Sequence, residues 1–364
     1  MITLSIAMIV KNEHDTLARC LECAKQIADE IIIVDTGSTD DTKDIARIYT
    51  DKIYDFKWVD DFSKARNFAF SKATMEYIMW LDADDVILED DIQKLKTLKN
   101  ILTKDVDMIM LKYNLNLDEN GVPSLSYYRE RIVKKVKNYK WVSPIHEVIP
   151  IAGKVIYENI AITHKKIHKG YSDRNLKIFE KMKKENYPFD ARQLFYYARE
   201  LMYAKKYEQS LEEYNNFLNH PNAWVENKIS ASLDLYDIYL NLNDNDNALI
   251  ALFNSFKYDI PRAEVCCKLG WHFISKKEYT IAIYWLNLAL NCKYDISSGG
   301  FYTPDFYNYI PYINLGFCYY NLGDIDKAIY YNEKAGKIKP NSSIYLDNKK
   351  VYENKRICEK QKEV

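Results

Sequence analysis

The sequence has no long apolar run and no segment typical of secretion. None of its apolar stretches approaches the roughly 20 residues that a membrane-spanning helix needs. Residues 1–10 are apolar, but no basic segment precedes them and no small-residue cleavage site follows them. We therefore expect no signal peptide, no membrane span and a cytoplasmic location.

Three further absences narrow the class of protein. Neither G-x-G-x-x-G nor G-x-x-x-x-G-K-[ST] occurs, so the sequence indicates neither a Rossmann dinucleotide site nor a P-loop. The seven cysteines are odd in number and scattered, which argues against a disulfide framework and favours a reducing compartment. The formal net charge is only -1, so there is no reason to expect a nucleic-acid partner.

The most informative stretch that is present runs from Tyr77 to Asp85. Its first five residues are apolar or aromatic, as in a buried strand, and then Asp82, Asp84 and Asp85 follow. Clustered carboxylates at a strand end favour a divalent cation, and oxygen ligands suit Mg²⁺ or Mn²⁺. The alternative is an acidic turn that caps a helix over residues 89–98.

Strands and helices alternate through the first 85 residues. At 364 residues the chain is too long for one ordinary core, so we expect two domains. The alternation predicts a doubly wound α/β domain with carboxylates at strand ends, at Asp35 and at Asp82 and Asp84. The pattern then changes to strands, predicted over 108–114, 131–135, 148–150 and 155–162.

The remainder of the chain is predicted to be helical and repetitive. Four pairs of residues lie 12 positions apart and bracket a turn, and the pairs begin 34 to 46 residues from one another. This spacing, with small residues at most of the expected helix crossings, resembles tetratricopeptide repeats. The pairs are Ala198 and Ser210, Tyr236 and Ala248, Gly270 and Ala282, and Gly316 and Ala328.

Several motifs together resemble family-2 glycosyltransferases with the nucleotide-sugar-binding GT-A fold. They are Lys11-Asn12-Glu13, residues 35–40, Asp82-Ala83-Asp84, residues 61–67 and Ile145-His146-Glu147. With the helical repeats, the chain is similar to bacterial family-2 enzymes that carry tetratricopeptide repeats, among them the peptide S-glycosyltransferases that modify glycocins. We therefore expect a GT-A catalytic domain over residues 1–175 and a repeat domain over residues 176–364.

The resemblance implies roles for particular residues of the donor site. Asp35 would contact uridine, Asp82 the ribose or a metal-bound water, and Asp84 the metal below the diphosphate. The third protein ligand would be His168, because imidazole suits Mn²⁺; the alternative is a packing or surface histidine, and His164 is the competing, more structural candidate. The nucleotide site would also be lined by Val10, Asn12, Glu13 and Arg66.

The base for inverting transfer is a separate question. Such a base takes the acceptor's proton as the acceptor attacks the anomeric carbon. Many relatives use an aspartate of a Glu-Asp pair, whereas this sequence has His146-Glu147. We assign Glu147 as the base with His146 beside it; the alternative is an exposed loop acid next to a structural histidine.

The resemblance thus implies a metal-dependent enzyme. It would transfer a hexose or N-acetylhexosamine from a UDP-sugar (UDP-glucose or UDP-N-acetylglucosamine) to a Ser, Thr or Cys side chain of a protein or peptide. A lipid-linked or polysaccharide acceptor is the alternative within the same chemistry, and a non-catalytic repeat scaffold is the alternative outside it. The repeats would bind the acceptor or form a homodimer.

Overall fold

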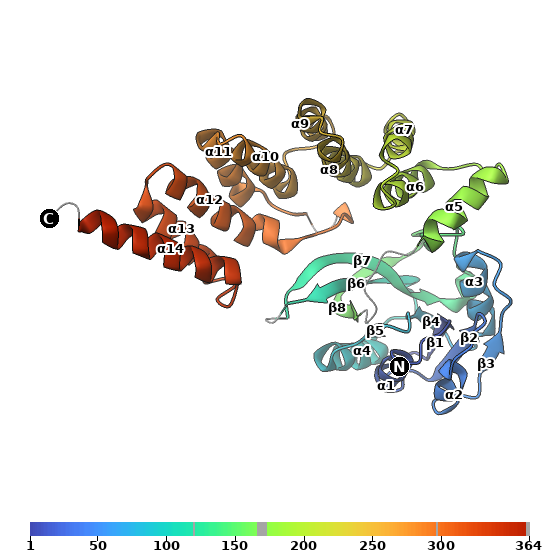
Figure 1. The fold of residues 1–364 in the computed structure, drawn as a ribbon. Helices are drawn as coiled ribbons and strands as arrows, with labels where there is room; N and C mark the ends of the chain where they lie inside the picture. Colours follow the sequence, from blue (N-terminus) through green and yellow to red (C-terminus); the bar gives the residue numbers. More distant parts are fainter. Residues whose placement is uncertain (119–120, 166–172, 296–297, 362–364) are drawn as a thin grey trace. The chain divides into compact units, whose positions relative to one another are not determined.

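The computed structural model describes residues 1–118, 121–165, 173–295 and 298–361 (Figure 1). The chain divides into two compact units, Met1–Pro188 and Phe189–Val364, and each is described by itself. No helix in these ranges is long and apolar enough to cross a membrane.

The first unit is built on one eight-stranded sheet, with strand order β3-β2-β1-β4-β7-β6-β8-β5. The four strands β3, β2, β1 and β4 are parallel, as predicted for an α/β domain. The sheet then becomes mixed, because β7 is antiparallel to both β4 and β6 while β8 is parallel to β6. The strands are β1 (Leu4–Val10), β2 (Glu30–Asp35), β3 (Ile53–Asp55), β4 (Tyr77–Trp80), β5 (Asp85–Val86), β6 (Met108–Leu117), β7 (Pro123–Lys134) and β8 (Val155–His164).

Helices lie on both faces of the parallel part of this sheet, and strands β1, β2 and β4 are accordingly buried along almost their whole length. Alternate residues of β1, such as Leu4, Ile6 and Met8, pack against one set of helices, whereas Ala7 packs on the opposite face. The first set is α1 (Leu17–Ala24), α2 (Thr42–Arg47) and α4 (Glu89–Ile101), and the opposite face is covered by α3 (Phe62–Lys72). A further helix, α5 (Arg174–Lys184), completes the unit.

The parallel register brings the ends of neighbouring strands to one edge. Val10 pairs with Asp35, and Ala7 of the same strand pairs with Trp80. Beyond Trp80 the chain turns, and the Asp85 N–H donates to the Asp82 carbonyl at 3.0 Å. The carboxylates predicted at strand ends therefore follow two strands that both flank β1.

One predicted strand is wrong. Residues 148–150 form no strand, and Val148 makes only an isolated bridge to Val142. The segment is a loop that packs Trp141 and Ile149 into the core on the α3 face. Its apolar residues therefore reflect burial in a loop rather than a place in the sheet.

The second unit consists of helices, as predicted. Successive helices pair as hairpins, α6 with α7, α8 with α9, α10 with α11 and α12 with α13, and α14 packs on α13. Short 3₁₀ turns lie at Ser255–Lys257 and Pro304–Tyr307, and another at Lys135–Lys137 in the first unit. The helices are α6 (Ala191–Tyr203), α7 (Tyr207–Leu218), α8 (Val225–Asn241), α9 (Asn245–Asn254), α10 (Ala263–Ser275), α11 (Tyr279–Asn291), α12 (Tyr309–Asn321), α13 (Ile325–Gly336) and α14 (Ser343–Lys360).

Small residues lie where the helices of a hairpin cross. The Ser210 hydroxyl donates to the Ala198 carbonyl at 2.7 Å. A Cβ on Gly316 would lie 3.2 Å from the Ala328 carbonyl oxygen, so only glycine leaves ordinary clearance there. These contacts confirm two of the four crossings that the 12-residue spacing predicted.

Candidate active site

A cavity of about 530 Å³ opens at the carboxyl edge of the parallel strands. Ligands of open α/β sheets bind in this position, beyond the strand ends. Its wall combines cations, carboxylates and aromatic rings. The lining residues are Ile9, Val10, Lys11, Glu13, Thr36, Trp58, Phe62, Arg66, Asp82, Ala83, Asp84, His164 and Arg174.

Five of the residues assigned from the sequence line this cavity, and four do not. Asn12, Asp35, His146 and Glu147 are not among the lining residues, and His168 lies outside the described residues. The five that do are Val10, Glu13, Arg66, Asp82 and Asp84.

Asp35 is buried behind the cavity wall, with one carboxylate oxygen satisfied. Its Oδ1 accepts hydrogen bonds from the backbone N–H groups of Gly37 and Ser38, at 2.8 and 2.9 Å. Its Oδ2 is buried without a hydrogen-bond partner in the described part of the chain. Because a buried carboxylate oxygen without a donor is costly, this atom could accept a hydrogen bond from a ligand N–H group, although it does not reach the cavity surface in this structure.

Asn12 connects the two loops that follow β1 and β2. Its backbone has a left-handed φ of 53°, a conformation that asparagine tolerates better than most residues. The side-chain Oδ1 accepts from the Thr39 N–H at 2.8 Å, and the Asn12 N–H donates to the Ser38 hydroxyl at 3.0 Å. Asn12 thus shapes the site without lining it.

Arg66 lies at the centre of the site. Its guanidinium carbon lies 5.1 and 4.8 Å from the ring centroids of Trp80 and Trp141, and these two rings meet edge to face. It donates to Glu147 Oε1 at 2.6 Å and to Asp82 Oδ1 at 2.9 Å. Burial alone would raise the pKa of Asp82, but the nearby arginines outweigh it and lower that pKa below its ordinary value.

Asp85 is the structural member of the acidic cluster. It is fully buried, and its Oδ2 accepts from Arg131 at 3.0 Å and from the Asp82 N–H at 3.1 Å. Its Oδ1 accepts from the Tyr113 hydroxyl at 2.9 Å. Both oxygens are therefore already engaged within the protein, and this pair fixes the turn that presents Asp82 and Asp84.

His164, at the end of β8, lies against Asp84. Its Nδ1 is 3.2 Å from Asp84 Oδ1, 3.5 Å from Asp85 Oδ1 and 2.9 Å from the Tyr113 hydroxyl. Burial would lower the pKa of His164, yet the hydrogen bonds and charges of Asp84 and Asp85 raise it to about 9. The residue that the sequence interpretation ranked below His168 thus lines the cavity beside the proposed metal-binding carboxylate.

This donor set suits a divalent cation. One ligand atom from each of Asp84, Asp85 and His164 lies within 4.8 Å of the others. Because Asp85 is engaged by Arg131 and Tyr113, Asp84 and His164 are the two that would hold the ion. Carboxylate and imidazole together favour Mn²⁺ over Ca²⁺.

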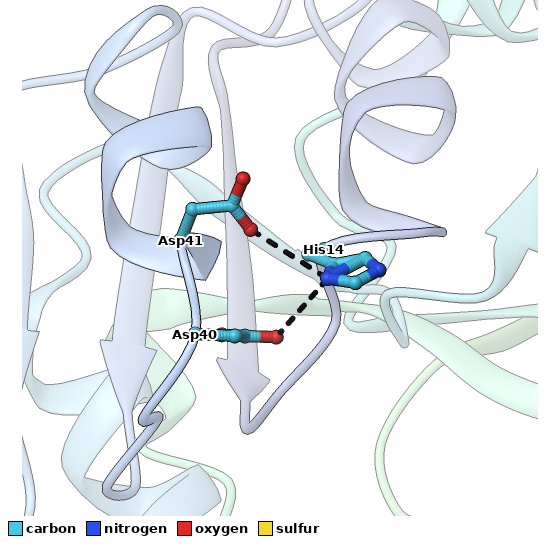
Figure 2. Close-up of side chains that lie close together, drawn as sticks. All are labelled: His14, Asp40 and Asp41. Carbon is cyan, nitrogen blue, oxygen red and sulfur yellow. Dashed lines mark ion pairs between the residues drawn. The ribbon is translucent and has the colours of Figure 1, made fainter.

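A second histidine–carboxylate group lies at the surface (Figure 2). His14 Nδ1 is 3.9 Å from Asp40 and 3.7 Å from Asp41. The His14 and Asp41 side chains are 50% and 63% exposed, so the ion pairs are screened by water. We interpret this group as a contact between the loops after β1 and β2, and no sequence motif pointed to it.

The two residues assigned as the base lie in the loop before β8. His146 has a left-handed φ of 50° and stacks on Phe179, with ring centroids 6.0 Å apart. The Glu147 side chain is 11% exposed and is held by Arg66. Glu147 is therefore joined to Asp82 through a single guanidinium group.

Sequence reasoning missed part of the cavity wall. Lys11 lies inside a quoted motif but had no assigned role, and Trp58 and Phe62 flank the strand-to-helix turn before α3. Arg174 follows the last strand by ten residues, and no pattern in the sequence places it at the cavity.

Comparison with known proteins gives the class of this site. Residues 5–152 match the family described as Glycosyl transferase family 2. A TPR repeat-containing protein of Synechococcus elongatus is 33% identical over 150 residues, 41% of this chain and 36% of the relative. The SPbeta prophage-derived glycosyltransferase SunS of Bacillus subtilis is 28% identical over 231 residues, 60% of this chain and 54% of the relative.

The matched region thus spans between about a third and just over half of these relatives. The fold and the site define an α/β domain with a polar, partly acidic cavity at the ends of its parallel strands. Residues 5–152 of this chain thus match glycosyl transferase family 2, and a unit of helical hairpins follows them.

Proposed function

We propose that the protein is a metal-dependent inverting glycosyltransferase. It transfers a hexose or N-acetylhexosamine from a UDP-sugar to a Ser, Thr or Cys side chain of a protein or peptide. The observation that carries this proposal is the meeting of Asp82, Asp84 and His164 at one cavity beyond the strand ends.

The donor would be held at two places. The unpartnered Oδ2 of Asp35 supports recognition of a base with an N–H donor, such as uracil. Asp84 and His164 would hold Mn²⁺ or Mg²⁺, which as a Lewis acid neutralises the charge of a departing nucleoside diphosphate. Asp82, kept ionised by Arg66, lies beside them.

The acceptor's proton would go to Glu147. Arg66 keeps this side chain close to Asp82, and so near the donor, but the same contact engages one of its oxygens. Transfer therefore needs the other oxygen of Glu147 to face the acceptor, with His146 beside it in the same loop.

The repeat unit supports a peptide or protein acceptor. Stacked helical hairpins create extended surfaces that bind peptide segments. The same surfaces would also serve a homodimer, and a polysaccharide or lipid-linked acceptor would leave the repeats without a role in acceptor binding.

Turnover of the donor tests the proposal. With UDP-glucose or UDP-N-acetylglucosamine and Mn²⁺, the protein should release UDP, slowly to water and faster with an acceptor. Asp84→Asn should reduce this rate by at least about a hundredfold, because the cation loses a ligand. Asp90→Asn is the matched control, since it removes an exposed carboxylate eight residues from Asp82.

A protein that releases no UDP from any common UDP-sugar would contradict the proposal and favour a non-catalytic scaffold. Equal rates of UDP release for Asp84→Asn and the wild type would contradict the proposed role of Asp84 as a metal ligand. A screen of peptide against glycan acceptors would then separate the two acceptor classes by which of them raises the rate of UDP release.

A further inference from the structure

Helix α5 contributes to the cavity although it follows the region that matches the family. That region ends at residue 152, whereas α5 begins at Arg174. Arg174 lines the cavity together with Asp84 and His164. Its guanidinium carbon lies 4.9 Å from the ring centroid of Phe62, another lining residue.

Several contacts fix α5 to the first unit. Phe179 is fully buried and stacks on His146. Lys181 pairs with Asp60 at 2.7 Å, and the Trp58 ring N–H donates to the same aspartate at 3.0 Å. Because Trp58 lines the cavity, these contacts hold one end of α5 and one wall of the cavity in a fixed relation.

The charges at the cavity wall indicate which positively charged side chains could balance a bound diphosphate. Arg66 is engaged by the carboxylates of Asp82 and Glu147, so its charge is largely balanced inside the protein. Among the described lining residues, Lys11 and Arg174 are the lysine and arginine side chains other than Arg66. A nucleoside diphosphate carries more negative charge than one divalent ion and its carboxylate ligands can balance, and the planar arginine fork matches phosphate oxygens.

We propose that Arg174 binds the diphosphate of the nucleotide-sugar donor, so that α5 is part of the donor site. The Phe62 ring lies next to the guanidinium and places Arg174 against another residue of the cavity wall. This inference rests on the proposed function, since it needs a nucleotide in the cavity.

Binding of UDP and of uridine separates a phosphate contact from a general structural role. Uridine has the same base and ribose but no phosphate. Arg174→Gln should weaken UDP binding in the presence of Mn²⁺ by about tenfold to a hundredfold, the usual effect of losing a charged hydrogen bond. Uridine binding, followed by ligand-detected NMR, should change less than about twofold.

Two further variants serve as controls. Lys177→Gln removes one positive charge from the same helix, at an exposed residue that pairs with exposed Asp173, and should leave UDP affinity unchanged. Arg174→Lys should restore part of the affinity, because it keeps the charge and loses the fork. Circular dichroism checks that each variant retains the wild-type fold.

Two results would overturn the inference. UDP affinity could be unchanged in Arg174→Gln, or UDP and uridine could weaken equally, as a structural defect would produce. Unchanged UDP affinity with a raised KM for an acceptor would place Arg174 on the acceptor side. A wild-type protein that binds no UDP would instead refute the proposed function itself.

Discussion

At the carboxyl edge of the sheet, some acidic side chains stabilise the fold and others line the cavity. Asp85 is neutralised by Arg131, which lies between the rings of Trp80 and Tyr113 at 3.6 and 4.3 Å. This buried pair is structural, and removal of either partner would leave the other charge buried in the core without a counter-ion. Asp82 and Asp84, which precede Asp85 by three residues and by one, line the cavity.

Glu264 in the repeat unit predicts a pH dependence of stability. Burial raises its pKa from 4.5 to about 7, although the Tyr307 hydroxyl lies within 3.1 Å. Between these values the folded state holds a proton that the unfolded state has lost. The contribution of Glu264 to the free energy of unfolding should therefore fall by about 3 kcal/mol as pH rises from 4.5 to 8.

Denaturation of the wild type and of Glu264→Gln at several pH values measures this contribution. The variant should gain stability relative to the wild type as pH rises, with most of the gain below pH 8. Glu208→Gln, at an exposed residue, is the control and should show no such trend. A constant difference between Glu264→Gln and the wild type across this range would contradict the prediction.

At the scale of elements, the four hairpin turns repeat one backbone feature. The residue after each first helix's C-cap has a left-handed φ, between 60° and 84°. Glycine adopts this conformation without steric cost, but only one of the four turns has glycine there. The four residues are Lys205, Asn243, Lys277 and Gly323.

Lys277→Gly should therefore stabilise the protein, by about 1 kcal/mol. Gly323→Ala should destabilise it by a similar amount, because its φ of 84° suits glycine alone. Urea denaturation of both variants measures the two changes. If both substitutions changed the free energy of unfolding in the same direction, the backbone conformation of the turn would not explain their effects on stability.

Local pattern predicted the elements better than their pairing. Patterns among residues close in sequence predicted the alternation of the first 85 residues and the strand before Asp82. The 12-residue spacing likewise predicted the helix crossings. Residues 148–150 were wrongly predicted as a strand because the sequence of an apolar loop that packs on the α3 face is similar to that of a buried strand. The sequence could not show that His164 lies beside Asp84, since His164 reaches Asp85 only through the pairing of β8 with β5, about 80 residues apart in sequence.

At the scale of the whole molecule, the two units differ in what their residues can do. The cavity and all the residues proposed to bind donor or metal that the structure describes belong to Met1–Pro188. The expected boundary after residue 175 falls inside α5, whereas the contacts divide the chain after Pro188. Helix α5 therefore groups with the α/β unit.

This division predicts the behaviour of two fragments. A fragment of residues 1–188 should fold and bind UDP, because it keeps the whole sheet and α5. A fragment of residues 1–152 should not fold stably, because it lacks β8, which lies between β6 and β5 in the sheet. Circular dichroism and thermal unfolding measure the difference, and two equally stable fragments would contradict the division.

The dependence of UDP binding on metal tests the central claim most directly. Isothermal titration calorimetry should show that Mn²⁺ tightens UDP binding to the wild type by at least about tenfold, or roughly 1.4 kcal/mol. Asp84→Asn should lose most of that gain while Asp90→Asn keeps it. Equal UDP affinity with and without Mn²⁺, or no UDP binding at all, would contradict the account.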